Sequence, residues 1–203
     1  MPTHPIDTAR RRWLRRSPLA LAPFVPTAFA PLFSAAGAQT MIEPATTRTA
    51  VSPATDRVVA RSVHLPLPPA QAFNWFTDNT LLQTWLTAVA EVEPRVGGKY
   101  ELFWQPDRRE DNSTIGCRVT AIAPAQLVAF TWRSPVQFKP FANAADPLTH
   151  VVVSFAAEGD GTRVHLIHSG WRGSAEWEQA RAWQDTAWKM AFEALAGAVA
   201  RPR

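Results

Sequence analysis

The chain has 203 residues and a single cysteine, Cys117, so we expect one ordinary domain with an extension, and an internal disulfide is excluded. Its formal charge of +4 comes from residues 1–38, which hold five arginines and one aspartate and leave 16 basic and 16 acidic residues elsewhere. Residues 39–203 are neutral overall and lack the concentrated basic face that nucleic-acid binding needs, so no nucleic-acid partner is expected. No Cys/His spacing indicates a zinc site, and no metal or cofactor is expected.

The N-terminal segment has the features of an export signal. A basic run at residues 10–16, which resembles a twin-arginine signal, precedes 26 uncharged residues, 17–42, and Ala-Gly-Ala at 36–38 fits signal-peptidase cleavage. Its prolines argue against a membrane span. We therefore expect residues 1–38 to be a signal peptide of an exported or periplasmic protein; the alternative is a cytoplasmic protein that starts at Met41.

The predicted domain spans residues 58–200 and follows a flexible linker, residues 39–57, that is rich in Thr, Ala and Pro. A strand over 58–67 opens it, and the prolines that follow favour the start of a short helix. Asp78 or Asn79 can cap a second short helix. Alternating apolar residues and tight turns then predict antiparallel strands at residues 99–104, 114–122, 127–133, 150–156 and 162–169.

A long final helix is predicted from Ser174 to about Ala200. Ser174 is a good N-cap, and acidic residues occupy the first turn, where the helix dipole favours them. Its apolar stripe consists of Trp188, Ala191, Phe192, Leu195 and Val199. Strands, two short helices after the first strand and one long C-terminal helix indicate an α+β fold.

Several motifs in this order resemble one known group of proteins. Residues 67–78 are similar to the opening helices of that group, and residues 95–100 (Arg-Val-Gly-Gly-Lys-Tyr) are similar to its double-glycine strand entry. Residues 116–132 match its central hairpin, and residues 161–170 match its last strand. The chain resembles the SRPBCC, or START-like helix-grip, superfamily, in the branch named after the activator of the heat-shock protein 90 ATPase. The resemblance covers about residues 58–200. It implies a curved antiparallel sheet wrapped around the C-terminal helix, with a hydrophobic ligand between them.

Aromatic side chains also favour an apolar ligand pocket. Eight tryptophans follow residue 38, and the inward positions of the predicted sheet and helix are bulky and rigid. Pockets are mostly apolar with a few polar groups, which fits this composition, although the same rings can simply fill the core. The candidate ligand-binding residues are Tyr100, Trp104, Phe130, Trp132, Phe155, His168, Trp188 and Phe192.

Histidines and the cysteine are the candidates for chemistry. His168 lies on the inward face of its strand, where it can bond a ligand or act as an acid or base; a structural hydrogen bond is the favoured interpretation. His165 points to the opposite face, so the two histidines cannot form a metal pair. Cys117 is interpreted as a small buried hydrophobe rather than a nucleophile.

Three charged residues are weaker candidates for pocket chemistry. Glu101 and Arg118 are expected to face solvent, and the side on which Asp185 lies along the final helix is open. No Ser/His/Asp arrangement, P-loop or paired-carboxylate pattern occurs, so no catalytic residue is assigned.

Binding of a small apolar or aromatic ligand is the favoured function, and the oligomeric state is open. The alternatives are a cyclase-like or hydrolase-like enzyme that works in the same cavity, and a chaperone-associated interaction module.

Residues 134–149 are long for a hairpin loop and contain Phe138 and Phe141. We interpret this loop as a lid over the pocket mouth or as an irregular connection.

Overall fold

The computed structural model describes residues 57–201. The predicted signal peptide, and all of the predicted linker except its last residue, lie outside the described residues. In chain order the elements are β1 (Val59–Leu65), α2 (Pro69–Thr77), α3 (Asn79–Trp85), β2 (Val89–Val92), β3 (Tyr100–Phe103), a 3-10 turn (Pro106–Arg108), β4 (Val119–Ala123), β5 (Leu127–Trp132), α4 (Lys139–Ala142), β6 (Thr149–Glu158), β7 (Gly161–Ser169) and α5 (Ala175–Val199).

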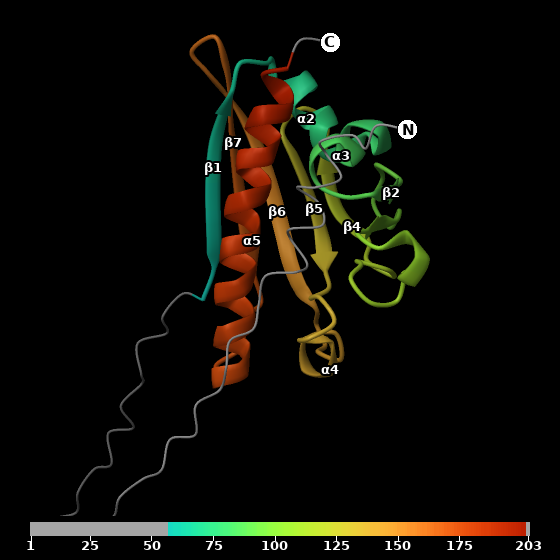
Figure 1. The fold of residues 1–203 in the computed structure, drawn as a ribbon. Coiled ribbons are helices and arrows are strands. Elements are labelled where there is room, and N and C mark those ends of the chain that lie inside the picture. The colour runs from blue at the N-terminus through green and yellow to red at the C-terminus, as the bar shows by residue number, and fades with distance from the viewer. Residues whose placement is uncertain (1–56, 202–203) are drawn as a thin grey trace, which may run out of the picture.

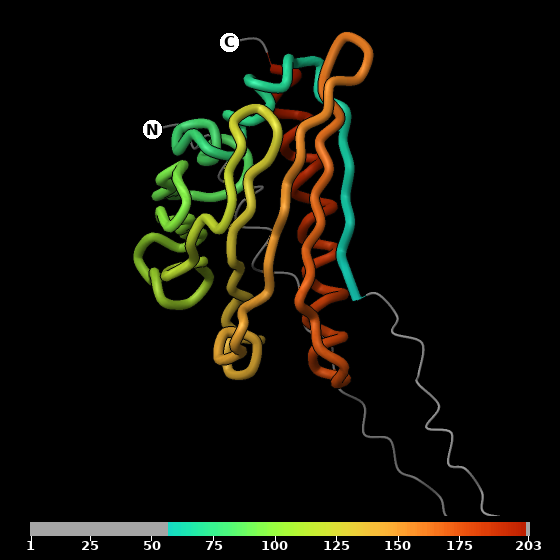
Figure 2. The backbone as a smooth tube through the Cα atoms, turned by 180° about the vertical axis from the view of Figure 1, so that it is seen from behind, coloured from blue at the N-terminus to red at the C-terminus, as the bar shows by residue number. Residues whose placement is uncertain are grey.

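Five strands form the main sheet in the order β1-β7-β6-β5-β4, and every neighbouring pair is antiparallel. The sheet curves around α5, which lies along one of its faces (Figure 1). From behind, the strands lie in front of α5 (Figure 2). The predicted α+β class, with its sheet, long C-terminal helix and two short helices after the first strand, is confirmed.

Strand periodicity sets which side chains meet α5. In β7, Val164, Leu166 and His168 are fully buried, whereas His165 and Ile167, which alternate with them, are exposed. The opposite orientations predicted for His165 and His168 are therefore confirmed.

Helix α5 buries the stripe that its sequence predicts and extends it toward the N-terminus. The Ser174 hydroxyl accepts a hydrogen bond from the backbone N–H of Trp177 at 3.5 Å, as expected of an N-cap. Val199, at the end of the stripe, is only partly buried. The buried residues are Trp177, Ala180, Gln184, Ala187, Trp188, Ala191, Phe192 and Leu195. No helix of residues 57–201 is both long and apolar enough to cross a bilayer.

The structure corrects the prediction for Glu101. This side chain is buried rather than solvated, and its Oε1 accepts a hydrogen bond from the backbone N–H of Gly116 at 3.0 Å. Alternation fails here because all four residues of β3 are buried. The strand pairs along one edge with β2, which the sequence analysis missed, and hydrogen-bonds along its other edge with residues 112–117. Strand β4 accordingly begins at Val119 and not at residue 114.

Candidate ligand site

Aromatic rings fill most of the space between the sheet and α5. Tyr100 and Phe130 stack with their ring centroids 3.6 Å apart, and the Tyr100 hydroxyl donates to the carbonyl oxygen of Phe76 at 3.0 Å. Phe155 and Phe192 both pack edge-on against the Phe76 ring, at 5.4 and 6.4 Å. These four candidate ligand-binding residues therefore belong to the packed core.

A small cavity lies beside the N-terminal half of α5. Its volume is about 30 Å³, which holds a water molecule but no larger guest. Its buried floor includes Trp132 and Trp188, while Trp104 and Trp183 are partly exposed at its rim. The lining consists of Leu86, Trp104, Asn112, Ser113, Trp132, Arg133, Pro135, Trp183, Gln184 and Trp188.

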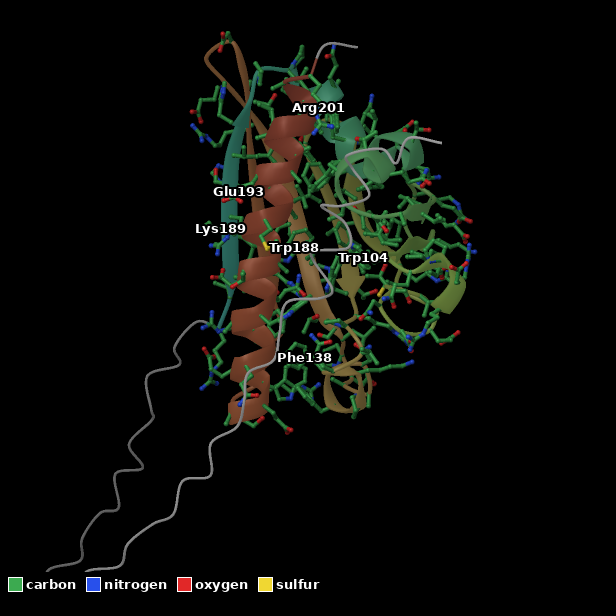
Figure 3. All side chains as sticks on the ribbon, in the orientation of Figure 1. Trp104, Phe138, Trp188, Lys189, Glu193 and Arg201 are labelled. Carbon is green, nitrogen blue, oxygen red and sulfur yellow. The ribbon has the colours of Figure 1, made fainter. Side chains whose placement is uncertain are left out.

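Three lining tryptophans are fixed by hydrogen bonds from their indole N–H groups. Trp104 Nε1 donates to the carbonyl oxygen of Leu86 at 2.7 Å, and Trp132 Nε1 donates to Oε1 of Gln184 at 3.3 Å. Trp188 Nε1 donates to Nδ1 of His168 at 3.1 Å. In Figure 3, Trp104 and Trp188 come from opposite sides of the space between α5 and the small β2-β3 sheet. Because these indole N–H groups are satisfied, the rings offer apolar faces to a guest.

His168 lies behind this wall and does not line the cavity. Its Nδ1 accepts from Trp188, so in the neutral ring Nε2 carries the hydrogen. That atom is buried and has no hydrogen-bond partner among the described residues. Burial, with a smaller contribution from His150, lowers the pKa of His168 to about 3. The ring is therefore neutral at physiological pH, and its visible role is to orient Trp188.

The other candidates for chemistry lie away from the cavity. Burial raises the pKa of the Cys117 thiol to about 11, so it is not a thiolate at neutral pH. Arg118 is exposed, as predicted, and Asp185 forms an ion pair with Arg61 at 2.5 Å. Residues 57–201 contain no cluster of three His, Cys, Asp or Glu side chains that could hold a metal ion.

The loop between β5 and β6 packs against α5 next to the cavity rim. The Phe138 ring meets Trp183 edge-on at 6.0 Å, and the Phe141 ring meets Trp177 at 5.3 Å. Both polar atoms of the Asn143 side chain bond the backbone of Ser134, which closes the loop on itself. Phe138 lies beside the N-terminal half of α5 (Figure 3).

Several lining residues were not predicted from the sequence. Gln184 lies four positions before Trp188, so the helical period extended toward the N-terminus would have assigned it to the inner face. Asn112, Ser113 and Arg133 carry no such local signal, because contacts between distant parts of the chain bring them to the rim.

A second hollow, of about 410 Å³, lies where the C-terminal end of α5 meets α2 and α3. Gln71, Asn74 and Arg201 are exposed around it, and Trp75 lies at its base. It contains none of the predicted ligand-binding residues.

A curved antiparallel sheet around a long C-terminal helix, with an aromatic interior between them, defines a helix-grip protein of the α+β class. The chain belongs to the family described as "Activator of Hsp90 ATPase homolog 1-like protein", whose family model matches residues 66–200. The resemblance inferred from the motifs is thus confirmed.

Solved structures with the same fold include protein MLL2253 from Mesorhizobium loti, which is 20% identical, with 72% of this chain and 98% of that chain covered and a TM-score of 0.57. An HSP90 activator from Plasmodium falciparum, PFC0360w, is 21% identical, with 71% and 97% covered and a TM-score of 0.56. Protein Ms6760 from Mycobacterium smegmatis is 16% identical, with 73% and 93% covered and a TM-score of 0.56. No curated protein matches the sequence.

Proposed function

We propose that this protein binds a small apolar molecule between α5 and the sheet, at the cavity walled by Trp104, Trp132, Trp183 and Trp188. The observation that carries the proposal is the combination of a buried aromatic floor with partly exposed tryptophans at the rim. Such a mostly apolar recess with a few polar groups is the usual form of a small-molecule site.

Binding requires the cavity to open, because about 30 Å³ holds no molecule of several carbon atoms. The rim is where opening costs least. Trp183 and Pro135 are only partly buried, and the loop that carries Phe138 is held on α5 by aromatic contacts. In this proposal the loop acts as a lid that moves with Trp183.

Catalysis and chaperone association remain the alternatives. An enzyme needs an acid or base at the cavity, and His168 is neutral and lies behind the lining. An activator of Hsp90 is suggested by the family description and the Plasmodium falciparum neighbour, whose similarity at 21% identity concerns the fold. A mature N-terminus at Gln39 in protein from its source cells would favour the proposed export and argue against a cytosolic chaperone partner.

The binding test uses the indole N–H signals in two-dimensional NMR spectra of isotope-labelled protein. Titration with two uncharged probes, n-octanol and naphthyl methanol, should shift the signals of Trp104, Trp132, Trp183 and Trp188. Single Trp-to-Phe variants assign the signals. Trp85, whose indole N–H donates to the Trp75 carbonyl at 3.0 Å outside the lining, serves as the unshifted control.

Two outcomes would overturn the proposal. The first is the absence of any indole shift up to the solubility limit of these probes and of the corresponding acids, n-octanoate and naphthoate. The second is a shift confined to Trp75, which would move the binding site to the second hollow. Native mass spectrometry of protein purified from its source would add the mass of a copurified ligand.

A further inference from the structure

Arg133 is the charged side chain at the rim of the cavity. It follows directly after β5. Its guanidinium lies over Gly116, so close that a Cβ atom at that position would be 3.6 Å from Nη2 and 3.8 Å from Cζ of Arg133. Its Nε atom is buried and has no hydrogen-bond partner in the described residues. The side chain is therefore held against the protein while part of its guanidinium has nothing to bind.

The other arginines of the described residues differ from Arg133 in one of two ways. Six of them form ion pairs with Asp or Glu side chains: Arg61, Arg95, Arg108, Arg109, Arg163 and Arg181. Four exposed arginines form no ion pair with a carboxylate of residues 57–201, and solvent reaches them: Arg57, Arg118, Arg172 and Arg201. Within residues 57–201, only Arg133 is both partly buried and without a carboxylate partner, and such a cation favours an anion beside it.

None of the carboxylates in residues 57–201 forms an ion pair with Arg133. Glu101 already accepts from the backbone of Gly116 and lies 3.7 Å from Lys99. The Asn112 side chain bonds Val136 and Gln105, and the Ser113 hydroxyl donates to the Arg109 carbonyl oxygen. The rim therefore combines one positive charge, neutral polar groups and a tryptophan-lined recess.

We propose that the ligand is an amphipathic carboxylic acid whose carboxylate pairs with Arg133 and whose apolar part lies among the tryptophans. This inference rests on the proposed function, which it makes more specific. The planar guanidinium fork matches a carboxylate in geometry and charge. A phosphate monoester carries more negative charge than one arginine neutralises, so a single fork beside neutral groups favours the monoanion.

Isothermal titration calorimetry with two matched pairs of probes tests this inference: n-octanoate against n-octanol, and naphthoate against naphthyl methanol. Each acid should bind the wild-type protein about tenfold or more tightly than its alcohol, as expected of a charge-assisted bond. Arg133→Met keeps an apolar stem and should remove that preference, whereas Arg133→Lys should retain part of it. The comparison of the aliphatic and aromatic pairs reports which class of acid fits.

Arg118→Met is the matched control, because it removes an exposed arginine in the same region that does not line the cavity. Its binding should equal that of the wild type. Equal loss in Arg118→Met and Arg133→Met would indicate a general charge effect and overturn the inference. Equal affinity of acid and alcohol for the wild type, which needs no variant, would also overturn it while the proposed function stands. Failure of all four probes to bind would overturn both.

Discussion

His168 and Trp188 share a buried hydrogen bond that gives each ring a defined role. Trp188 can only donate, so the bond exists only while Nδ1 of His168 is free of a proton. A charged His168 would place two donors against each other in a site from which water is excluded. Burial, with a smaller contribution from His150, also disfavours the charged form and lowers the pKa of His168. The neutral form of one residue thus fixes the orientation of a cavity wall.

Stability should therefore decrease as the pH falls below about 6.5. In the unfolded chain His168 binds a proton near its ordinary pKa of 6.5, whereas in the folded protein its pKa is about 3. Between these two pKa values the unfolded state binds more protons than the folded state. The free energy of unfolding therefore decreases as the pH decreases. Between about pH 6.5 and pH 5 we expect a loss of about 2 kcal/mol, measured by urea unfolding.

His168→Asn is the control for this prediction. The Asn Oδ1 can replace Nδ1 as the acceptor for Trp188 but does not titrate. His150, whose pKa burial also lowers, remains in the variant, so the difference between the two proteins isolates His168. A pH dependence as steep in the variant as in the wild type would contradict the assignment.

Cys117 should be inert toward thiol reagents in the folded protein. It is fully buried, its pKa is raised to about 11, and it is the only cysteine of the chain, so the signal is unambiguous. We expect reaction with Ellman's reagent at about pH 8 to be limited by unfolding and to be complete at once in guanidinium chloride. Rapid labelling of the native protein would show that the segment around Gly116 opens readily.

At the scale of elements, the connection between β5 and β6 is where a small change should have a local effect. Phe138→Ala removes the ring contacts with Trp183 and Phe141. Each aromatic pair contributes about 0.5–1.5 kcal/mol, so the loop should detach more often while the sheet persists. Proteinase K, followed by mass mapping, should cut faster within residues 134–148.

Val136→Ala is the matched control for that experiment. Val136 belongs to the same loop but is 44% exposed, and its truncation should leave the cleavage rate unchanged. If Phe138→Ala were cut no faster than this control, the proposal that the loop acts as a lid would be contradicted. Addition of n-octanol should change the cleavage rate only if the lid responds to ligand.

The order of the main-sheet strands, of the two short helices and of α5 could be predicted because each of these elements carries a local signal. Ser174, the stripe around Trp188 and the alternation in β7 depend on residues a few positions apart. The four-residue β2 is too short to show a period, and the burial of Glu101 depends on residues 112–118 covering β3. Local patterns contain no information on such coverage.

The candidate site was predicted only in part for the same reason. Trp104, Trp132 and Trp188 line the cavity, and their position follows from the inner faces of sheet and helix. Tyr100 and Phe130 stack closely and leave no space for a ligand between them. Such packing depends on the three-dimensional positions of the rings, which cannot be predicted from the sequence pattern. Arg133 lies over Gly116, which is distant in sequence, so no local pattern indicates its position at the rim.

For the molecule as a whole, Tyr100 reports unfolding in alkali. It is the only tyrosine of the chain, it is fully buried, and desolvation raises its pKa far above the ordinary value of 10. The unfolded state therefore loses a proton that the folded state retains, so stability falls as the pH rises above about 10. The phenolate absorbance should appear in one step together with the loss of circular dichroism.

A phenolate signal that precedes unfolding would contradict this prediction, because it would require local access of hydroxide to the core. Tyr100→Phe keeps the ring that stacks on Phe130 and removes the titrating group. This variant should resist alkali better than the wild type, although it loses the hydrogen bond to Phe76, which contributes about 1 kcal/mol.

The small volume left among the tryptophans has a consequence for affinity. If a guest enters only a rare open conformation, the apparent dissociation constant is the intrinsic one divided by the fraction of molecules that are open. Substitutions that loosen the rim without meeting the guest, such as Phe138→Ala, should then tighten binding while they weaken the fold. Tolerance to heat and strength of binding would change in opposite directions in one series of variants.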